Sequence, residues 1–204
     1  IVVSDAGSAY YVTSQTLKIK GALRYITSGS QADMGFTLPA SIGAAVAAEG
    51  LRKVIGITGD GSFQMNIQEL QTIVNYNLPI KIFILNNGGY LSIRNTMDKF
   101  FEGRYFGTDA GSGLVLPNTQ KIANAYEIPY FSIKDLDDIN NKLDLILETP
   151  GYSITEVFCP FKQDILPSSS TKEDQNGKLY SPPLEYMSPF LTDEEFKKEM
   201  ITKP

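Results

Sequence analysis

The chain has no histidine and only one cysteine among its 204 residues. Without histidine it can build neither a zinc site of histidine and cysteine ligands nor a Ser–His–Asp catalytic triad. The single cysteine, Cys159, cannot form an internal disulfide, and we expect it to be a small buried side chain at the end of a strand. A reducing compartment fits this cysteine usage best, so we expect a cytoplasmic protein.

Long apolar runs and blocks of basic charge are also missing. The longest apolar stretch, residues 80–85, is interrupted by Lys81 and is far shorter than the roughly 20 residues that cross a bilayer. The net charge is −5, so we expect neither nucleic acid nor a membrane as a partner. No signal-peptide pattern opens the chain, and a strand pattern begins at Ile1 without an initiator methionine. We therefore expect a domain of a longer protein.

What is present is an alternation of strand and helix patterns. The strand patterns occupy residues 1–4, 23–26, 53–59, 80–85, 129–133 and 153–158. The helix patterns occupy residues 9–18, 38–50, 67–74, 92–100, 118–128 and 135–148, with candidate caps at Asn66 and Asn118. Buried strands that alternate with helices predict an α/β fold, a doubly wound parallel sheet with right-handed crossovers and helices on both faces.

The composition changes near residue 160. Residues 160–191 are rich in proline, serine and tyrosine, and Thr192 and Glu195 have the spacing of a capping box for a short helix. We expect an irregular arm that docks through its aromatic and leucine side chains. The predicted organisation is therefore a domain over residues 1–159, followed by a C-terminal arm with a short helix over residues 160–204.

Two polar turns stand at the ends of consecutive strand patterns. Asp60 lies between two glycines after the first strand, and Asn86 and Asn87 precede two glycines after the second. Because a helix separates the strands, both turns face the same edge of a parallel sheet. They would lie about 5 Å apart if the strands are neighbours and about 10 Å apart if one strand intervenes. Ligands of open α/β sheets bind at this edge.

The residue types at these turns suit a metal ion and a phosphate together. Glycine-flanked loops let backbone N–H groups approach phosphate, but Asp60 would repel the ligand unless a cation lay between them. Carboxylate and amide oxygens suit Mg²⁺, and a third oxygen could come from the backbone of Gly89. Each turn alone is more often an ordinary turn, and the chain has neither a complete dinucleotide fingerprint nor a Walker lysine. The two turns together are far more specific than either one.

These residues resemble a known family. The segments "GDGSFQMN" and "ILNNGGY", with Asn87 placed 27 positions after Asp60, resemble the cofactor motif of thiamine-diphosphate-dependent enzymes. The segments "DMGFTLPASIGAA" and "SDAGSAYY" are similar to their equivalents in the acetolactate synthase group. The resemblance extends to about Phe158 and implies the C-terminal, diphosphate-binding domain of an acetolactate-synthase-like protein. The pyrimidine-binding and central domains of such enzymes are missing from this chain.

The resemblance implies a set of site residues. The metal ligands for Mg²⁺ would be the side chains of Asp60 and Asn87 and the carbonyl of Gly89. The cofactor-binding residues would be Ala6, Gly7, Ser8, Ala9, Ala32, Met34, Gly59, Gly61, Ser62, Tyr90, Leu91 and Ser92. Among them, Met34 would hold the cofactor in its bent form, although plain core packing is the alternative for a methionine.

The resemblance also implies the chemistry. Such enzymes decarboxylate a 2-oxo acid such as pyruvate and ligate the two-carbon unit to an acceptor, as in branched-chain amino acid biosynthesis. The cofactor supplies its own base, which accounts for the lack of histidine. No catalytic residue is expected in this chain, because the activating glutamate would come from the pyrimidine-binding domain of a partner subunit. We interpret Glu69 and Glu156 as structural.

Several points stay open from the sequence. A homo-oligomer, dimer or tetramer, is expected, and FAD is possible in the full-length protein. Ser8 and Ala9 stand where acetolactate synthases have Gln–His, and Thr96 stands where those that prefer 2-ketobutyrate as acceptor have tryptophan, so the acceptor is undetermined. The alternatives are another thiamine-dependent decarboxylase, a sugar-modifying carboligase, or a non-catalytic module that binds diphosphate and metal.

Overall fold

The protein, described from a computed structural model over residues 1–201, consists of two compact units. The first unit is Ile1–Gln163 and the second is Asp164–Pro204. The division falls after Gln163 rather than after Cys159, where the change of composition placed it. One reason is that Arg94 donates a hydrogen bond of 2.9 Å to the carbonyl of Phe161, which ties the start of the expected arm to the first unit.

The first unit is built on a six-stranded sheet in which every neighbouring pair is parallel. Its strands are β1 (Val2–Ser4), β2 (Tyr25–Thr27), β3 (Val54–Gly59), β4 (Ile80–Asn86), β5 (Tyr130–Ile133) and β6 (Ser153–Phe158). The strand order β2-β1-β3-β4-β6-β5 confirms the predicted doubly wound sheet. Strands β3 and β4 are direct neighbours, with Gly59 opposite Leu85, so the two polar turns leave adjacent strand ends.

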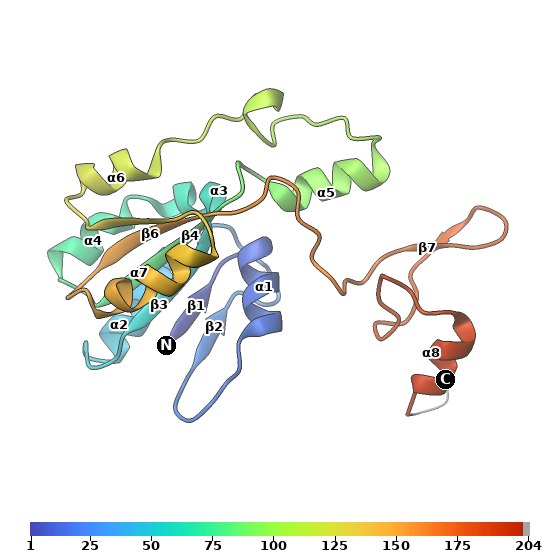
Figure 1. Cartoon of the computed structure of the whole chain (residues 1–204), viewed down its shortest axis with the longest axis horizontal. Coiled ribbons are helices and arrows are strands. Elements are labelled where there is room, and N and C mark those ends of the chain that lie inside the picture. Colours follow the sequence, from blue (N-terminus) through green and yellow to red (C-terminus); the bar gives the residue numbers. More distant parts are fainter. Residues whose placement is uncertain (202–204) are drawn as a thin grey trace. The chain divides into compact units, whose positions relative to one another are not determined.

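Helices cover both faces of the sheet, with α1 and α7 on one face and α2 and α4 on the other (Figure 1). The helices of this unit are α1 (Ser8–Thr16), α2 (Thr37–Ala47), α3 (Asp60–Phe63), α4 (Glu69–Asn75), α5 (Leu91–Phe100), α6 (Thr119–Ala125) and α7 (Leu136–Glu148). The core lies between the layers, where Ile80, Ile84 and Ile154 are completely buried. Burial of these apolar strand residues is the main force that holds the helices on the sheet.

Of the two helix caps predicted at asparagine residues, one is present in the structure and one is not. Asn118 caps α6 as predicted, because its side chain accepts a hydrogen bond of 2.9 Å from the N–H of Lys121. The cap predicted at Asn66 is wrong, since a helical turn already begins at Asp60 and the chain passes through a 3-10 turn before α4. The Asn66 amide instead donates a hydrogen bond of 2.9 Å to the carbonyl of Gly35.

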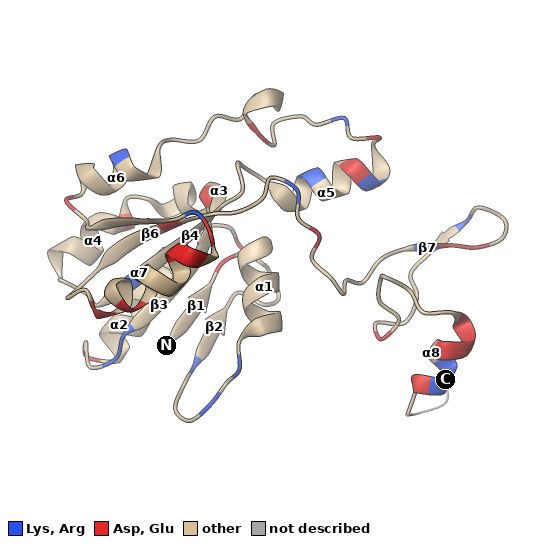
Figure 2. Cartoon of the chain, viewed as in Figure 1, with Lys and Arg blue, Asp and Glu red and all other residues tan. Residues whose placement is uncertain are grey.

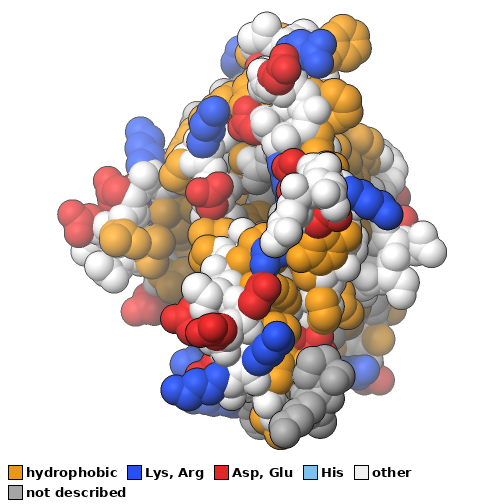
Figure 3. Space-filling model, turned by 90° about the vertical axis from the view of Figure 1, so that its right-hand side faces the viewer, with side chains coloured by type: hydrophobic (Ala, Val, Ile, Leu, Met, Phe, Trp, Pro, Cys, Tyr) orange, Lys and Arg blue, Asp and Glu red, His pale blue; other side chains and the backbone are white. Residues whose placement is uncertain are grey.

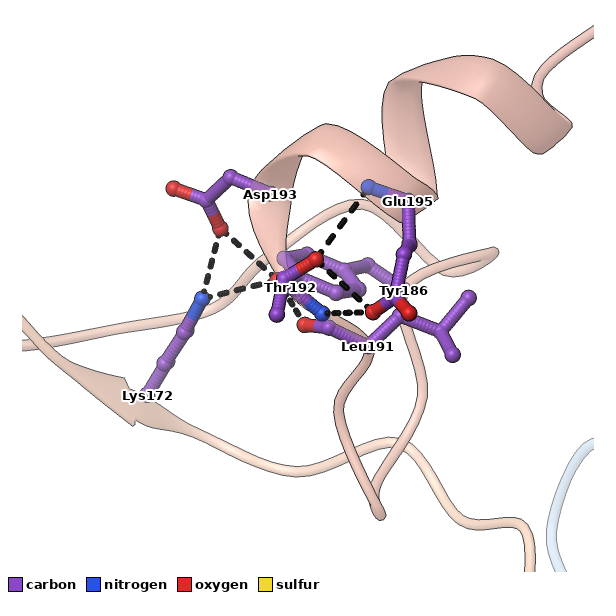
Figure 4. Close-up of polar contacts among 6 residues, drawn as sticks. All are labelled: Lys172, Tyr186, Leu191, Thr192, Asp193 and Glu195. Carbon is purple, nitrogen blue, oxygen red and sulfur yellow. Dashed lines mark hydrogen bonds and ion pairs between the residues drawn. The ribbon is translucent and has the colours of Figure 1, made fainter.

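The second unit has more regular structure than the irregular arm expected. It contains a short antiparallel hairpin of β7 (Lys172–Glu173) and β8 (Leu179–Tyr180), followed by helix α8 (Asp193–Glu199). The predicted capping box is present, with Thr192 and Glu195 hydrogen-bonded in both directions (Figure 4). Acidic residues begin α8 and basic residues follow toward its end (Figure 2), which is the favourable order for a helix dipole.

Tyr186 organises this second unit. Its side chain is buried, its ring stacks on Phe196 with centroids 4.2 Å apart, and its hydroxyl lies 2.6 Å from the carbonyl of Leu191. The Lys172 ammonium contacts both the Tyr186 hydroxyl and the Asp193 carboxylate, at 2.9 and 3.0 Å (Figure 4). These two partners, Tyr186 first, raise the pKa of Lys172, so the lysine is charged at neutral pH.

We expect Tyr186→Phe to loosen the second unit while leaving the first unit intact. The variant keeps the stacked ring but removes the hydroxyl, which is worth about 1 kcal/mol. Brief digestion with a protease should cut within residues 164–201 about fivefold faster than in the unaltered protein. Tyr180→Phe is the matched control, because Tyr180 lies in the same unit and is 43% exposed. Equal cleavage rates for the two variants would contradict this role of Tyr186.

Acidic and basic side chains are interspersed with hydrophobic ones on the face shown in Figure 3. Across residues 1–201, none of the helices has both the length and the apolar character that a membrane crossing requires.

Candidate metal and diphosphate site

The two polar turns form one site. Asp60 follows β3 directly and is the first residue of α3, with 6% of its surface exposed. One carboxylate oxygen accepts a hydrogen bond of 2.8 Å from the N–H of Gly61, and the other accepts one of 2.9 Å from the N–H of Gly89, in the turn after β4. The carboxylate therefore joins the turn after β3 to the turn after β4.

The carboxylate of Asp60 lies in an environment that disfavours its negative charge. Burial raises the pKa of Asp60, and the N–H groups of Gly89, Gly61 and Gly88 together with the charge of Arg94 act in the opposite direction. No ion pair with a lysine or arginine compensates the charge within the described residues. The charge of Arg94 acts on Asp60 without an ion pair, and a metal ion beside Asp60 would bring a positive charge into direct contact with the carboxylate.

Asn87 contributes a second oxygen that lacks a partner. The residue is 6% exposed, and its side-chain oxygen Oδ1 accepts no hydrogen bond from the described part of the chain. Leaving a buried acceptor unsatisfied costs about 1–3 kcal/mol. An amide oxygen of this kind is a suitable ligand for a hard cation such as Mg²⁺.

Glycine is required where the two turns meet. Gly89 has φ +128°, and a Cβ atom on it would collide with the carbonyl oxygen of Thr108. A Cβ atom on Gly61 would collide with the ring of Tyr90. A larger residue at Gly89 would displace the segment that carries Thr108, and one at Gly61 would displace the Tyr90 ring.

Asp60 is the only charged side chain among the candidate metal ligands. Over residues 1–201, nowhere do three or more cysteine, aspartate or glutamate side chains come together around a common metal position. A cation at Asp60 would depend on the Asn87 amide, on backbone carbonyls and on oxygens of a bound ligand. This pattern fits Mg²⁺ shared with a diphosphate, because Mg²⁺ is typically held by one or two carboxylates plus phosphate oxygens.

The other predicted cofactor-binding residues lie after β1, in the segment after β2, at the end of β3, in α3 and at the start of α5. Gly7 has φ +61° and precedes α1, and a Cβ atom on it would lie 3.2 Å from the Ser92 hydroxyl, so the first loop and the start of α5 are adjacent. The side chains of Ala9 and Leu91 are buried, at 1% and 3% exposure, and Ser62 is buried as well. The remaining predicted positions are Ala6 and Ser8 beside Gly7, Gly59 at the end of β3, and Ala32 with φ +52°.

Met34 is not a core residue. Its side chain is 38% exposed, which excludes the core-packing alternative. The next residue, Gly35, has φ +84°, and a Cβ atom on it would lie 2.6 Å from the Cβ of Met65. The carbonyl of Gly35 accepts a hydrogen bond from the Asn66 amide, so the loop presents Met34 in a fixed position.

Asp5 is a residue that the sequence analysis missed. It is 2% exposed at the end of β1, and its carboxylate accepts four hydrogen bonds of 2.9–3.1 Å. The donors are the N–H groups of Ala6, Gly35 and Thr37 and the hydroxyl of Thr58. Asp5 therefore ties the Met34 loop to β1 and β3. The signal in the sequence was an aspartate directly after a strand pattern, as at Asp60.

Glu156 was interpreted as structural, and the structure shows that it contacts Asn86, where the turn after β4 begins. It is 5% exposed on β6 and accepts hydrogen bonds of 2.7, 3.0 and 2.5 Å from Asn86, Thr119 and Tyr130. The Asn86 side chain in turn accepts a hydrogen bond of 3.0 Å from the N–H of Gly88. Glu156 thus supports the turn from the β6 side, with its carboxylate already occupied by donors.

Comparison with known proteins places the chain in a family. Residues 5–157 match the family described as "Thiamine pyrophosphate enzyme, C-terminal TPP binding domain". Acetolactate synthase 2, chloroplastic, of Nicotiana tabacum is 35% identical over 171 residues, which are 82% of this chain and 26% of that protein. The acetolactate synthase large subunit of Cyanidium caldarium is 37% identical over 148 residues, covering 72% of this chain and 25% of that protein. The chain spans about a quarter of the length of these relatives.

Solved structures confirm the fold. Benzoylformate decarboxylase from Polynucleobacter necessarius superposes with a TM-score of 0.70 at 22% identity, over 81% of this chain and 31% of that one. The thiamine diphosphate-dependent 4-hydroxybenzoylformate decarboxylase of Rhodococcus jostii RHA1 superposes with a TM-score of 0.68 at 26% identity, over 80% and 30% of the two chains. The chain belongs to the family of C-terminal, thiamine-pyrophosphate-binding domains of thiamine pyrophosphate enzymes.

Proposed function

We propose that this chain is the diphosphate- and Mg²⁺-binding part of an acetolactate-synthase-like enzyme. The enzyme would decarboxylate pyruvate or another 2-oxo acid and ligate the two-carbon unit to an acceptor. The observation that carries the proposal is the unpartnered, buried oxygen of Asn87 in the turn that is hydrogen-bonded to Asp60. The relatives named acetolactate synthase support the class of reaction.

The chain's own residues would bind and orient the cofactor. Asp60, the Asn87 side chain and the Gly89 carbonyl would hold Mg²⁺. The backbone around Gly61 and Gly7 would donate hydrogen bonds to the diphosphate, with the remaining predicted positions around them. When bound, thiamine diphosphate supplies its own base and its own electron sink, so the protein need not provide a histidine. The exposed side chain of Met34 would support the bend of the cofactor.

The rest of the enzyme would come from elsewhere. We propose that a pyrimidine-binding domain of a partner subunit supplies the activating glutamate, within a homo-oligomer, and that FAD, if present, sits outside this chain. We propose a cytoplasmic location, and the single cysteine is the only observation that favours it. The tobacco relative gives no support, because its name places that protein in the chloroplast.

A simple 2-oxo-acid decarboxylase is the second candidate. It is favoured by the likeness in fold to the Rhodococcus jostii enzyme, whose name describes a decarboxylation. The two candidates differ in the step after the loss of CO₂, because a carboligase joins the two-carbon unit to an acceptor and a decarboxylase releases an aldehyde. A sugar-modifying carboligase would turn over only with a sugar-derived acceptor, and a non-catalytic module would not turn over at all.

Calorimetry of the full-length protein tests the proposal. Thiamine diphosphate should bind in the presence of Mg²⁺ and much more weakly in its absence, because the diphosphate would face the Asp60 carboxylate without an intervening cation. Subsequent incubation with pyruvate, alone and with acceptor ketones or aldehydes, separates the candidates by their products. Lack of any Mg²⁺-dependent binding of thiamine diphosphate would refute the proposed function.

Met34→Ala is expected to reduce turnover more than cofactor affinity. The side chain would set the bend of the cofactor without contacting its phosphates, and a misplacement of 1 Å can cost up to about a hundredfold in rate. We expect kcat to fall by about tenfold or more, with an unchanged Kd for thiamine diphosphate. Met187→Ala is the matched control, because Met187 is 39% exposed in the second unit. A variant that binds the cofactor poorly but turns over normally at saturation would show that Met34 has a different role.

A further inference from the structure

Arg94, in the middle of α5, is the largest of the fully buried side chains, with 1% of its surface exposed. A buried guanidinium is costly unless its donors are satisfied, and the usual partner is a carboxylate. None of the ion pairs within residues 1–201 involves Arg94. The hydrogen-bond partners of the guanidinium are therefore neutral, and the carboxylates of Asp60 and Asp109 act on it through their charge without forming an ion pair.

Backbone carbonyls from separate segments of the chain accept hydrogen bonds from the two terminal nitrogens of the guanidinium, while its Nε is buried without a partner among the described residues. Nitrogen Nη2 donates hydrogen bonds of 2.8 Å to the carbonyl of Asn87 and 2.9 Å to that of Phe161. Nitrogen Nη1 donates longer ones, 3.3 Å to Thr108 and 3.4 Å to Gly88. The ring of Phe161 covers the guanidinium, with 4.0 Å between its centroid and the central carbon Cζ. A planar fork of donors suits this arrangement, and a lysine could not reproduce it.

Two of these carbonyls belong to the turn that carries the proposed metal ligands. Because the carbonyls of Asn87 and Gly88 are bonded to Arg94, they are turned toward α5. The Asn87 side-chain oxygen has no such bond, and Arg94 makes no hydrogen bond to the Gly89 carbonyl. The same turn is fixed on its other side by the hydrogen bond from the Gly89 N–H to Asp60.

We propose that Arg94 is a positioning residue that decides which oxygens of this turn can reach a cation. It engages the peptide oxygens of Asn87 and Gly88 and leaves the Asn87 side-chain oxygen for Mg²⁺. The Gly89 carbonyl stays available together with the Asp60 carboxylate. This inference rests on the proposed function, because it assumes that the site binds Mg²⁺ with thiamine diphosphate.

The sign of the effect separates positioning from simple electrostatics. A guanidinium near a metal site repels the metal, so removal of its charge alone would strengthen Mg²⁺ binding. Positioning predicts the opposite, because a turn released from Arg94 would no longer present Asn87 correctly. It also predicts selectivity, since Mg²⁺ demands near-ideal octahedral geometry whereas Ca²⁺ accepts flexible coordination.

The experiment uses Arg94→Lys in the full-length protein, which loses the fork of donors but retains the charge, so that simple electrostatics predicts an unchanged Mg²⁺ affinity. Mg²⁺ and Ca²⁺ are each titrated calorimetrically at saturating thiamine diphosphate. We expect the Mg²⁺ affinity to fall by about tenfold or more, with a clearly smaller loss for Ca²⁺. Arg104→Lys is the matched control, because Arg104 is exposed and its Nε bonds only to the nearby carbonyl of Phe101. That control should bind both ions as the unaltered protein does.

Other outcomes would overturn the inference. Mg²⁺ binding that is unchanged or tighter in Arg94→Lys rules out a positioning role, and an equal loss for both ions indicates general damage to the site.

If Arg94→Lys does not fold, Phe161→Leu decides the question, because it removes the covering ring while keeping the arginine and every carbonyl. It should shift the two affinities in the same direction by a smaller factor, and unchanged affinities would overturn the inference. If the unaltered protein shows no Mg²⁺-dependent cofactor binding, the proposed function fails, and this inference fails with it.

Discussion

Replacement of Asp60 by asparagine in the full-length protein is expected to weaken Mg²⁺ binding by more than about a hundredfold, which corresponds to roughly 2.7 kcal/mol. Asp60 is the only charged group among the proposed metal ligands, so its neutralisation removes the strongest attraction for the cation. Binding of thiamine diphosphate should fall in parallel, because the diphosphate would share the lost metal ion. Calorimetry with both ligands measures the two affinities directly.

Asparagine is a better test than alanine, because Asp60 also has a structural role. A position just past the end of a strand would by itself predict that Asp60→Ala leaves the fold intact. In the structure the carboxylate is 6% exposed and accepts hydrogen bonds from the N–H groups of Gly61 and Gly89. Alanine would leave both donors without a partner, at about 1–3 kcal/mol each where they stay buried. Asparagine retains the shape and one acceptor oxygen.

Asp144→Asn is the control for loss of a negative charge, because Asp144 is exposed on α7. It should bind Mg²⁺ and thiamine diphosphate as the unaltered protein does. The metal assignment fails if Asp60→Asn folds, as judged by its thermal unfolding curve, and still binds Mg²⁺ with unaltered affinity.

The fold was predictable because its signals are local. Short, largely apolar stretches rich in β-branched residues, such as residues 80–85, are typical of buried strands, and each is separated from the next by a helix pattern. The observed strand β4 differs from that prediction by a single residue, Asn86. The sequence could not say whether β3 and β4 are neighbours, because parallel strands can pair across an intervening one. That point was settled by tertiary structure, through the register from Val54 with Ile80 to Gly59 with Leu85.

The proposed site was predictable only in its outline. Asp5 and Asp60 both follow strands directly, but the first accepts four hydrogen bonds and the second accepts two. A sequence does not distinguish a satisfied carboxylate from one with oxygens left for a cation. Arg94 was missed for a related reason, because the groups that bury it lie far along the chain, with Thr108 14 positions away and Phe161 67 positions away. No local pattern records such contacts.

The largest effect is expected for the chain of 204 residues produced by itself, which should release no CO₂ from pyruvate. The two glutamates that the sequence analysis interpreted as structural both accept hydrogen bonds from neighbouring side chains. Glu156 is occupied by three donors, and Glu69 accepts a hydrogen bond of 3.1 Å from Thr72 on its own helix. The activating glutamate and the pyrimidine half of the site would have to come from the partner domain, so the isolated chain would hold the cofactor through its diphosphate alone.

The isolated chain should also associate with itself. Met34 is 38% exposed and Val46, on α2, is 60% exposed, and we propose that the pyrimidine-binding domain covers this region in the full-length enzyme. The predicted lack of activity is tested by incubating the purified chain with thiamine diphosphate, Mg²⁺ and pyruvate and measuring CO₂ release, with the full-length protein as the positive control. The predicted self-association is tested separately. Light scattering should report a mass above that of one chain, and Val46→Lys should lower it, since a charge on this surface opposes association. Cofactor-dependent CO₂ release by the isolated chain would mean that residues 1–204 contain a complete active site, and the assignment of half a site to this domain would be wrong.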